Sequence, residues 1–411
     1  SWETQGDVSL QWFRFDSNNK REKSELTAGL FSQVELFQKK EKSEYRFKLI
    51  IEFNNDDKNR NRAEMQEAYL SWSWGQKDWK ILFGNKIFNW AVLEVFRPTD
   101  SINSRYYGLL HENSDKLGEM TFELERRFSD SSLSFYFFPF FIPPRFPSQE
   151  SRMGLGVDLD DNAVITSRGE SKDFWWVLQG GLRAEGSWRG LDWGVHFIHH
   201  IDRRFPIVGT SELSGNIPQN IEALRRGEVS VYYFKVNEYG FGAVTELGAG
   251  LLKIEGVHRD FDDGRKRIFS IRELDLRTPQ DHTEVALGVE RTFDLGLPFE
   301  TTLMVEFNRI FDVNKKNRKE MAVFQQDLFI GTKHSFNDIR GREVLLGFIV
   351  DLEGENETFY SLEYTYRPYD DFKIDAGLRV YDAPSTENSQ LYGFKKFDRN
   401  NHAFLNLILF F

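Results

Sequence analysis

The histidines are the first side chains in this sequence that could do chemistry, because imidazole binds metal ions and acts as a general base near neutral pH. His199 and His200 are neighbours, and His196 and His258 lie in similar alternating segments. Neighbouring residues on a strand point to opposite faces, so His199 and His200 do not converge on one ion. We therefore predict no histidine metal site and no catalytic histidine.

Two acidic segments are the other candidates for ligand binding. Residues 158–162 (DLDDN) and 260–264 (DFDDG) place several oxygen atoms close together, as a Ca²⁺ site requires. Neither segment has the full spacing of an EF-hand loop, and acidic surface turns are the commoner explanation. We predict no metal site, and calcium bridging of these two segments stays open.

Nucleophile and cofactor motifs are missing from the sequence. It contains no cysteine, which excludes disulfides, thiolate nucleophiles and cysteine metal sites. The Gly-x-Ser-x-Gly, P-loop and His-Glu-x-x-His patterns are also absent. We therefore expect no catalytic residues and no cofactor, and we predict that the protein is not an enzyme.

Acidic and basic residues that alternate with apolar ones are the remaining side chains that could bind or orient a ligand. In the segment 45–53 (YRFKLIIEF), Arg46, Lys48 and Glu52 share one face, and every second residue from Tyr45 to Phe53 is apolar. A period of two is typical of a strand with two unlike faces. Aromatic residues make up 15% and charged residues 28% of the chain, so the sequence can supply many such strands.

The same alternation predicts about eighteen strands along the chain. No stretch approaches the roughly 18 consecutive apolar residues that a membrane-spanning helix needs. The predicted strands cover residues 8–15, 25–38, 43–54, 64–74, 78–84, 116–128, 131–139, 174–187, 190–200, 238–247, 250–261, 281–292, 298–310, 326–336, 341–352, 358–367, 371–381 and 401–411.

The connections between these strands alternate between long and short. The long ones, most of which are polar, cover residues 16–24, 55–63, 85–115, 140–173, 201–237, 262–280, 311–325 and 382–400. Aromatic residues flank several of the tight ones, for example Trp74 and Trp79, or Trp188 and Trp193. Only the connection at 353–357 is short where a long one is expected. Short turns on one side, long loops on the other and aromatic girdles are typical of a membrane-spanning β-barrel.

The last segment of the sequence carries a specific pattern. Apolar residues occupy every second position from Ala403 to Phe411, and the sequence ends on Phe. This pattern resembles the C-terminal signal of Gram-negative outer-membrane proteins of the porin and channel superfamily. The resemblance implies a location in the bacterial outer membrane and contact with its lipids and lipopolysaccharide. It also implies that the barrel-assembly machinery recognises the strand that ends at Phe411.

We therefore predict one domain over residues 1–411, an all-β transmembrane barrel of antiparallel up-and-down strands. About 18 strands are expected, with 16 as the alternative, joined by short periplasmic turns and long extracellular loops. Such a barrel leaves an aqueous lumen, because only barrels of about eight strands are filled by their own side chains. The predicted lumen lining is Arg46, Lys48, Glu52, Glu123, Arg183, Glu185, Lys253, Glu255, Arg259, Glu306 and Arg379. Salt-bridge ladders across a plugged interior are the alternative for these residues.

The third long connection, residues 85–115, is too apolar for a solvated loop, with Phe88, Trp90 and Phe96 among its residues. We expect it to fold into the lumen, and it resembles the loop that narrows the pore in general porins and larger substrate-specific channels. Its predicted constriction residues are Lys86, Glu94, Arg97, Asp100, Asn103 and Arg105. Opposed charges there would orient a permeating solute. The alternative is that this connection lies over the rim and braces the other loops.

These patterns predict a channel for the passive diffusion of small hydrophilic solutes. The region around residues 85–115 also resembles alginate-export-type barrels, so an export or lipid-transport barrel with a periplasmic partner is the alternative. An outer-membrane hydrolase is a third hypothesis, and it lacks a visible nucleophile. The formal net charge of −11 argues against nucleic acid as a partner. The solute, the ion selectivity and the choice between homotrimer and monomer stay open.

Overall fold

The computed structural model describes most of the 411 residues of the chain. The described residues are 2–16, 24–107, 115–154, 159, 163–166, 170–171, 177–204, 207–210, 230–262, 268–270, 276–277, 280–315, 318, 322–353, 357–383 and 400–411. Every structural statement below concerns these residues.

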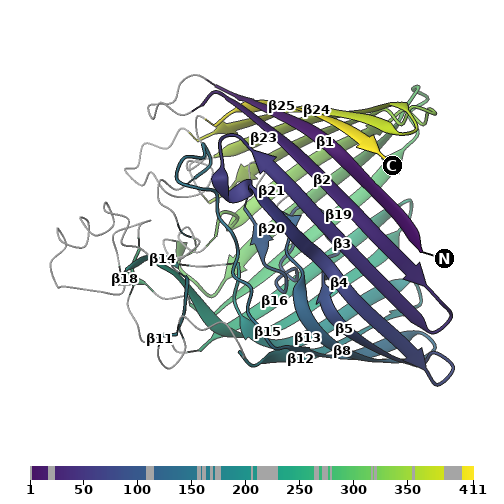
Figure 1. The fold of residues 1–411 in the computed structure, drawn as a ribbon, viewed down its shortest axis with the longest axis vertical. Helices are drawn as coiled ribbons and strands as arrows, with labels where there is room; N and C mark the ends of the chain where they lie inside the picture. Colours follow the sequence, from purple (N-terminus) through teal and green to yellow (C-terminus); the bar gives the residue numbers. More distant parts are fainter. Residues whose placement is uncertain are drawn as a thin grey trace.

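Eighteen strands form one closed antiparallel barrel (Figure 1). They are β1 (Glu3–Phe15), β2 (Leu26–Lys39), β3 (Ser43–Asn54), β4 (Arg62–Trp74), β5 (Trp79–Lys86), β8 (Glu119–Arg127), β9 (Ser131–Phe138), β12 (Gln179–Trp188), β13 (Leu191–Ile201), β15 (Ser230–Leu247), β16 (Gly250–Phe261), β19 (His282–Phe293), β20 (Glu300–Phe311), β21 (Gln326–Ser335), β22 (Glu343–Asp351), β23 (Thr358–Tyr369), β24 (Phe372–Asp382) and β25 (His402–Phe410). Each strand pairs with the next of these, and β1 pairs with β25 to close the sheet. The prediction of an all-β antiparallel barrel with eighteen strands is confirmed, and the sixteen-stranded alternative is wrong.

The two faces of the barrel wall differ in polarity. On β8, Phe122 and Leu124 are exposed on the outer face, whereas Glu119, Thr121 and Glu123 are buried on the inner face. Exposed apolar side chains recur on the outer face around the barrel: Leu10, Leu30, Phe47, Phe53, Leu70, Phe83, Phe135, Phe197, Phe241, Leu252, Leu287, Ile330, Leu346, Leu362, Leu378 and Leu405. A water-soluble sheet has the opposite arrangement, with its apolar face against a core.

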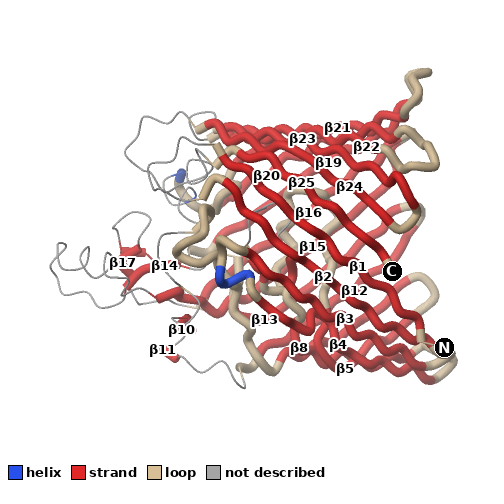
Figure 2. Tube along the Cα trace, turned by 45° about the horizontal axis from the view of Figure 1, so that its top comes forward, coloured by secondary structure: helices blue, strands red, loops and turns tan. Residues whose placement is uncertain are grey.

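The connections at the two ends of the barrel differ in length. At one end of the barrel, tight turns such as residues 75–78 and 189–190 join neighbouring strands. The first strand begins and the last strand ends on this side (Figure 1). Gly75 (φ 57°) and Gly190 (φ 82°) adopt a left-handed backbone in these turns, which glycine does without steric cost. The longer connections leave the wall at the other end (Figure 2), and their described parts include residues 87–107 and 139–154.

Short elements lie at the end with the long connections. Two small groups of strands occur there, namely β10 (Ala163–Thr166), β11 (Glu170–Ser171), β14 (Ile207–Thr210), β17 (Ile268–Ser270) and β18 (Leu276–Arg277), and the pair β6 (Arg105–Tyr106) and β7 (Asp115–Lys116). β10 and β14 pair with the first residues of β15, which therefore extends beyond the barrel wall. One 3₁₀ turn, η1 (Lys58–Arg60), precedes β4. In the described part of the chain, no helix has the length and apolarity to cross a membrane.

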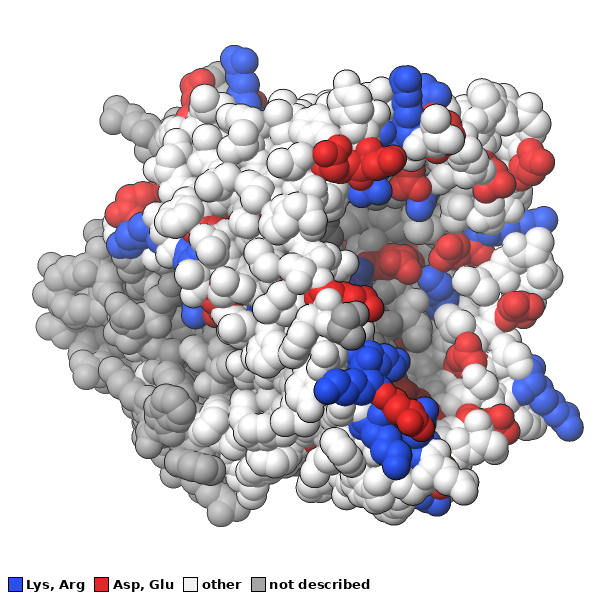
Figure 3. All heavy atoms as spheres, turned by 45° about the vertical axis from the view of Figure 1, so that its right-hand side comes forward, with Lys and Arg blue, Asp and Glu red and all other residues white. Residues whose placement is uncertain are grey.

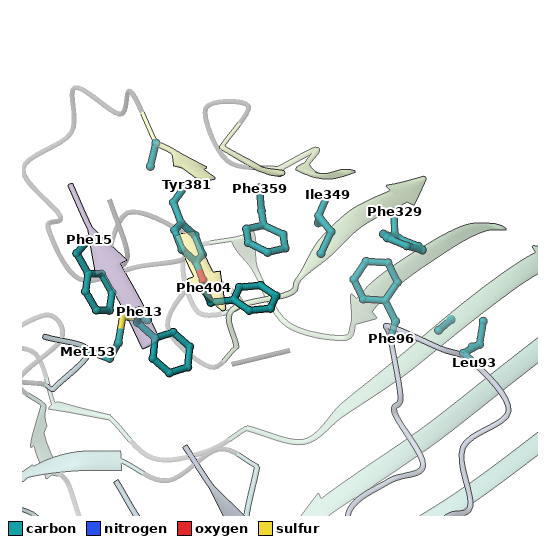
Figure 4. Close-up of a cluster of buried hydrophobic side chains, with 12 residues drawn as sticks. Phe13, Phe15, Leu93, Phe96, Met153, Phe329, Ile349, Phe359, Tyr381 and Phe404 are labelled. Atoms are coloured by element: carbon teal, nitrogen blue, oxygen red, sulfur yellow. The ribbon is translucent and has the colours of Figure 1, made fainter. Parts of the chain in front are cut away.

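The largest buried apolar cluster lies on the inner face of the wall. It contains Phe13, Phe15, Phe329, Ile349, Phe359, Tyr381 and Phe404 from the wall strands, together with Leu93, Phe96 and Met153 from two long connections (Figure 4). The wall residues come from β1, β21, β22, β23, β24 and β25, which are neighbours in the barrel. The two connections therefore pack against the inside of the wall, and this part of the interior is filled.

Gly84 on β5 is a position where the backbone requires glycine. Its φ of +129° is left-handed, and a Cβ there would lie 2.1 Å from the carbonyl oxygen of Ala68. We expect Gly84→Ala to destabilise the barrel by about 1–3 kcal/mol through backbone strain and this clash. Gly248→Asn is the matched control, because its Cβ would meet no atom within 4 Å and Asn tolerates positive φ. Urea unfolding followed by heat-modifiable gel mobility compares the two, and equal midpoints would contradict the expectation.

Candidate functional site

The inner face of the wall carries ladders of charged side chains. Figure 3 shows a hollow at the tight-turn end, with acidic and basic side chains around its mouth. On the inner face near this end, the Arg46 guanidinium lies 2.9 Å from Glu35 and 3.6 Å from Glu67. Lys80 and Glu125 form a looser pair at 3.9 Å. Because the Arg46 side chain is 35% exposed, water reaches this charged wall.

Residues 87–104, here called the inner segment, are bound to the inner face by Glu255 on β16. The Glu255 carboxylate accepts hydrogen bonds from the backbone N–H groups of Val92 (2.5 Å), Leu93 (2.8 Å) and Thr99 (3.1 Å), and from the Thr99 hydroxyl (2.6 Å). Glu255 itself is fully buried. Hydrogen bonds to an ionised acceptor are stronger than neutral ones, so this carboxylate is a firm anchor for the backbone.

Glu306 on β20 provides a second anchor of the same kind. Its carboxylate accepts hydrogen bonds from the backbone N–H groups of Glu94 (2.7 Å), Val95 (3.0 Å) and Phe96 (3.0 Å). Glu306 is also buried. The inner segment is therefore held across β16 and β20 by carboxylates that satisfy backbone groups which no secondary structure pairs.

Aromatic packing holds the two flanks of the inner segment. On one flank, Phe88 and Trp90 pack against Tyr136 on β9, with ring centroids 5.5 Å away in both cases. On the other flank, Leu93 and Phe96 belong to the apolar cluster on the inner wall (Figure 4). The apolar residues that make this connection unusual in sequence are thus the ones that contact the wall.

Glycines on the inner face make room for the inner segment. Gly288 on β19 lies under Leu93, since a Cβ at Gly288 would come within 2.4 Å of the Leu93 side chain. Gly242 on β15 lies under Val92, with a corresponding distance of 3.7 Å. The absence of a side chain at these glycines therefore leaves space for the inner segment where it approaches the wall most closely.

A buried ionic network lies beneath the inner segment. Arg259 on β16 donates hydrogen bonds to Glu238 (2.9 Å), to Glu284 (2.9 Å) and to the carbonyl oxygen of Pro98 (2.7 Å). Glu238 also accepts a hydrogen bond from the hydroxyl of Ser101 (2.5 Å). Arg259 and Glu238 are completely inaccessible to solvent. The network therefore joins the wall charges directly to the backbone of the inner segment.

The histidines of β13 divide between the two faces of the wall. His196 and His200 point inward, with their Nε2 atoms 3.1 and 3.7 Å from the Glu238 carboxylate. His199 lies on the opposite face and contacts Asn237 at 2.8 Å. Within the described ranges, no group of three or more His, Asp or Glu side chains is arranged to hold a metal ion. Residues 158, 160–162, 263 and 264 of the two acidic segments lie outside those ranges.

Three of the six constriction candidates brace the inner segment. Asp100 forms ion pairs with Arg105 (2.5 Å) and with Lys116 on β7 (2.7 Å). Burial lowers the pKa of the Lys116 ammonium, and the neighbouring Asp100 carboxylate opposes that shift. Asn103 is buried, and its amide oxygen accepts a hydrogen bond from the N–H of Phe88 (2.7 Å). Asp100, Asn103 and Arg105 therefore shape the segment by binding other parts of the same connection.

Among the described residues, the charged groups of the other three candidates form no ion pair within this connection. Lys86 pairs with Glu123 at 2.8 Å on the inner wall. The Glu94 side chain is 53% exposed and lies 3.2 Å from the Lys253 ammonium. Arg97 is half-buried, and its side chain forms no hydrogen bond or ion pair with any other described residue. Its backbone carbonyl accepts a hydrogen bond from the Asp100 N–H (3.2 Å). Glu94 is thus the candidate with a largely exposed carboxylate, and Arg97 is the candidate whose side chain has no partner among the described residues.

The predicted lumen residues lie on the inward face of their strands, and most of them are paired. Besides the residues treated above, Arg183 pairs with Glu185 (2.9 Å) and Arg379 with Glu363 (3.1 Å). Glu52 pairs with Arg60 and Arg62, and Lys48 lies in register between Glu35 and Glu67. Salt-bridge ladders, which were the alternative prediction for these residues, are therefore present in much of the wall.

Sequence reasoning missed Glu238, the carboxylate at the centre of the buried network. The sequence does indicate that Glu238 points inward. It lies two and four residues before Gly240 and Gly242, which are on the inner face of β15. Its partners Ser101, His196 and Arg259 lie on three other parts of the chain. No local pattern in the sequence connects them.

Comparison with known proteins identifies no relative in sequence. No protein-family model and no curated protein matches the chain. Among solved structures, engineered variants of the Rhodopseudomonas blastica porin match with a TM-score of 0.45 and identities of 9% and 10%, over 100% of both chains. A structure described as "Asymmetric conductivity of engineered proteins" matches with a TM-score of 0.44 and 9% identity, again over 100% of both chains. At these TM-scores the similarity carries no argument, and the assignment of a closed antiparallel barrel rests on the pairing of the eighteen strands.

Proposed function

We propose that this protein is an outer-membrane channel through which small hydrophilic solutes diffuse passively. The observation that carries the proposal is the inverted polarity of a closed barrel, apolar outside and charged inside. Closure leaves no unpaired sheet edge, which is the condition for crossing a bilayer with strands. A barrel of eighteen strands is also too wide for its wall side chains to fill.

The outer face supports a location among membrane lipids. Large apolar side chains such as Phe53 and Phe135 are exposed on it. Trp74 and Trp79 stack at a tight turn with ring centroids 6.1 Å apart, and the nearby turn at Trp188 also exposes its indole. Aromatic rings favour the level of the lipid headgroups. We propose that these rings belong to the girdle on the periplasmic side and that lipopolysaccharide surrounds the opposite end.

The inner segment is the proposed constriction. Its Glu94 carboxylate and the Lys253 ammonium lie 3.2 Å apart, and Glu290 lies 2.8 Å from the same ammonium. Arg97 adds a positive charge without a partner among the described residues. Fixed charges of both signs at a narrow point select solutes by size and orientation. Small polar or zwitterionic molecules fit this arrangement better than large apolar ones.

The last strand supports a role for the barrel-assembly machinery as a partner. Phe411 and Gly6 exchange two backbone hydrogen bonds of 3.0 Å where β25 meets β1. This seam joins the first and last strands of the barrel, so both strands have an unpaired edge whenever the seam is open, and an unpaired edge can bind another strand. We propose that the machinery binds this edge through the strand that ends at Phe411. Both a monomer and a homotrimer are compatible with the closed barrel.

Single-channel recording in a planar bilayer tests the proposal. Refolded wild-type protein is expected to give steady conductance. A variant that lacks residues 88–104 is expected to give roughly twofold higher conductance or more, because the narrowest part of the pore has been removed.

Folding of both proteins is checked first by heat-modifiable gel mobility, so that a collapsed variant is not mistaken for a closed channel. The absence of conductance from both folded proteins would overturn passive diffusion and favour a plugged or partner-gated exporter. Equal conductance of the two would overturn the constriction and leave the channel intact.

A further inference from the structure

Buried oxygen atoms gather on the inner face where β20, β21 and β22 meet the long connections. Asn308, Asp327 and Asp351 are successive cross-strand partners on these three strands. Gln325 immediately precedes β21. Asn308 and Asp327 are completely buried, and Gln325 and Asp351 nearly so. Cross-strand partners have Cβ atoms about 5 Å apart, so their side-chain oxygens can meet at one point.

Three of these side chains have polar atoms without a hydrogen-bond partner. Asp327 accepts a hydrogen bond from the Gln325 N–H through Oδ2 (2.5 Å), while its Oδ1 has no partner among the described residues. Both amide atoms of Asn308 and the Oε1 of Gln325 are likewise unpartnered. The Gln325 amide nitrogen is satisfied by the carbonyls of Ala322 and Val323. Such a concentration of unsatisfied buried oxygen is unusual, because folded proteins pair nearly all of these atoms.

The Asp327 carboxylate has no positively charged partner among the described residues. Asp327 and Asp351 face each other across neighbouring strands, and like charges in that position repel. No lysine or arginine in the described part of the chain forms an ion pair with Asp327. Arg318 lies in the connection that precedes β21, and it is bound to the Glu353 carboxylate through a 2.8 Å hydrogen bond. A buried carboxylate in this situation requires a cation or a proton.

We propose that this group binds one calcium ion, with the free oxygens of Asp327, Asn308 and Gln325 as ligands and Asp351 as a second negative charge. Calcium takes six to eight oxygen ligands in flexible geometry, and carboxylate and amide oxygens are its usual protein donors. The site has two carboxylates and two amides, so backbone oxygens and water complete the shell. Metals that prefer nitrogen or sulfur find no such donor in this set.

The position of the site connects it to the inner segment. Gln325 follows Phe324, whose ring packs on Phe96 of the inner segment with centroids 5.3 Å apart. Val323 and Phe324 both pack against the apolar cluster of Figure 4. A calcium ion held by Gln325 and Asp327 would therefore fix the end of connection 312–325 and, through Phe324, support the inner segment.

Calcium titration by calorimetry tests the site in the full-length refolded protein after removal of divalent ions with EDTA. Asp327→Asn keeps the shape of the side chain and removes its charge. Asp312→Asn is the matched control, since Asp312 is an exposed carboxylate in the same connection that accepts a hydrogen bond from Thr283 (2.7 Å). We expect wild type and Asp312→Asn to bind one more Ca²⁺ per chain than Asp327→Asn. This difference separates the site from any binding by residues 158–162 and 260–264.

Asn308→Ala is the second variant, which keeps both carboxylates and removes one neutral ligand. We expect it to retain the stoichiometry and to weaken calcium binding at this site by roughly tenfold or more. Calcium is also expected to raise the thermal midpoint of wild type and of Asp312→Asn but not of Asp327→Asn. Equal stoichiometry in wild type and a folded Asp327→Asn would overturn the proposal and leave Asp327 as a protonated or hydrated group.

Discussion

Channels of the double variant Glu255→Gln/Glu306→Gln are expected to fluctuate between the wild-type conductance and a larger one, because the inner segment leaves the wall. The two carboxylates together accept six backbone N–H groups and one hydroxyl from this segment. Glutamine has the same shape but carries an N–H₂ group in place of one acceptor oxygen. At least one N–H group of the segment therefore faces another donor at each anchor.

The size of this effect follows from the penalty for an unpaired buried group. Each lost acceptor costs about 1–3 kcal/mol, so the two substitutions together weaken the attachment by about 2–6 kcal/mol. The released population should rise between roughly thirtyfold and roughly twenty-thousandfold. The apolar contacts of Leu93 and Phe96 remain, which is why we expect repeated release and return rather than a permanently open channel.

Glu363→Gln is the matched control for this experiment. Glu363 is an inward glutamate on β23 that pairs with Arg379 (3.1 Å). Its substitution removes the same kind of charge from the lumen without touching a hydrogen bond to the inner segment. Steady single-level currents from the double variant, like those of Glu363→Gln, would show that the two carboxylates do not hold the segment.

The strands could be predicted from sequence because each wall residue has only two environments. In a single-layered barrel a side chain faces either the apolar surroundings or the polar interior, so the period of two is visible in segments such as 45–53. The errors lie at strand ends. β15 begins at Ser230, whereas the alternation predicts residue 238, because β10 and β14 pair with its first residues. Pairing between segments that are distant in sequence decides where such strands begin and end. A local residue pattern gives no information about that pairing.

The candidate site could be predicted only in part for the same reason. The apolar character of residues 85–115 marks a connection that must pack against something. Which of its polar residues face a solute depends on their partners. Asp100 looks like a pore charge in sequence, yet Arg105 and Lys116 neutralise it. Glu94 and Arg97 are also charged, yet the Glu94 side chain is 53% exposed beside Lys253 and the Arg97 side chain has no partner among the described residues. The sequence alone does not distinguish these situations.

Arg259→Met is expected to lower the stability of the barrel by about 3–5 kcal/mol, because it leaves buried carboxylates without their guanidinium. Methionine fills a similar length of apolar space, so the loss is mainly electrostatic. Glu284 retains an ion pair with Arg204 at 3.2 Å. Among the described residues, Glu238 then has the His196 and His200 imidazoles beside it, at 3.1 and 3.7 Å, and no guanidinium. Most of the penalty should therefore come from Glu238. Urea unfolding of the refolded protein measures it.

A second substitution at Glu238 distinguishes this explanation from simple loss of packing. If Arg259 stabilises the barrel by compensating Glu238, the double variant Arg259→Met/Glu238→Gln should recover most of the lost stability, because no buried charge is left unpaired. If Arg259 acts through its size and its hydrogen bond to the Pro98 carbonyl, the second substitution should add to the damage, since it also weakens the bond from Ser101. Arg259, Glu238 and Glu284 all lie on wall strands, so recovery would show that the wall balances these charges by itself. The inner segment would then add only the Pro98 carbonyl and the Ser101 hydroxyl to the network.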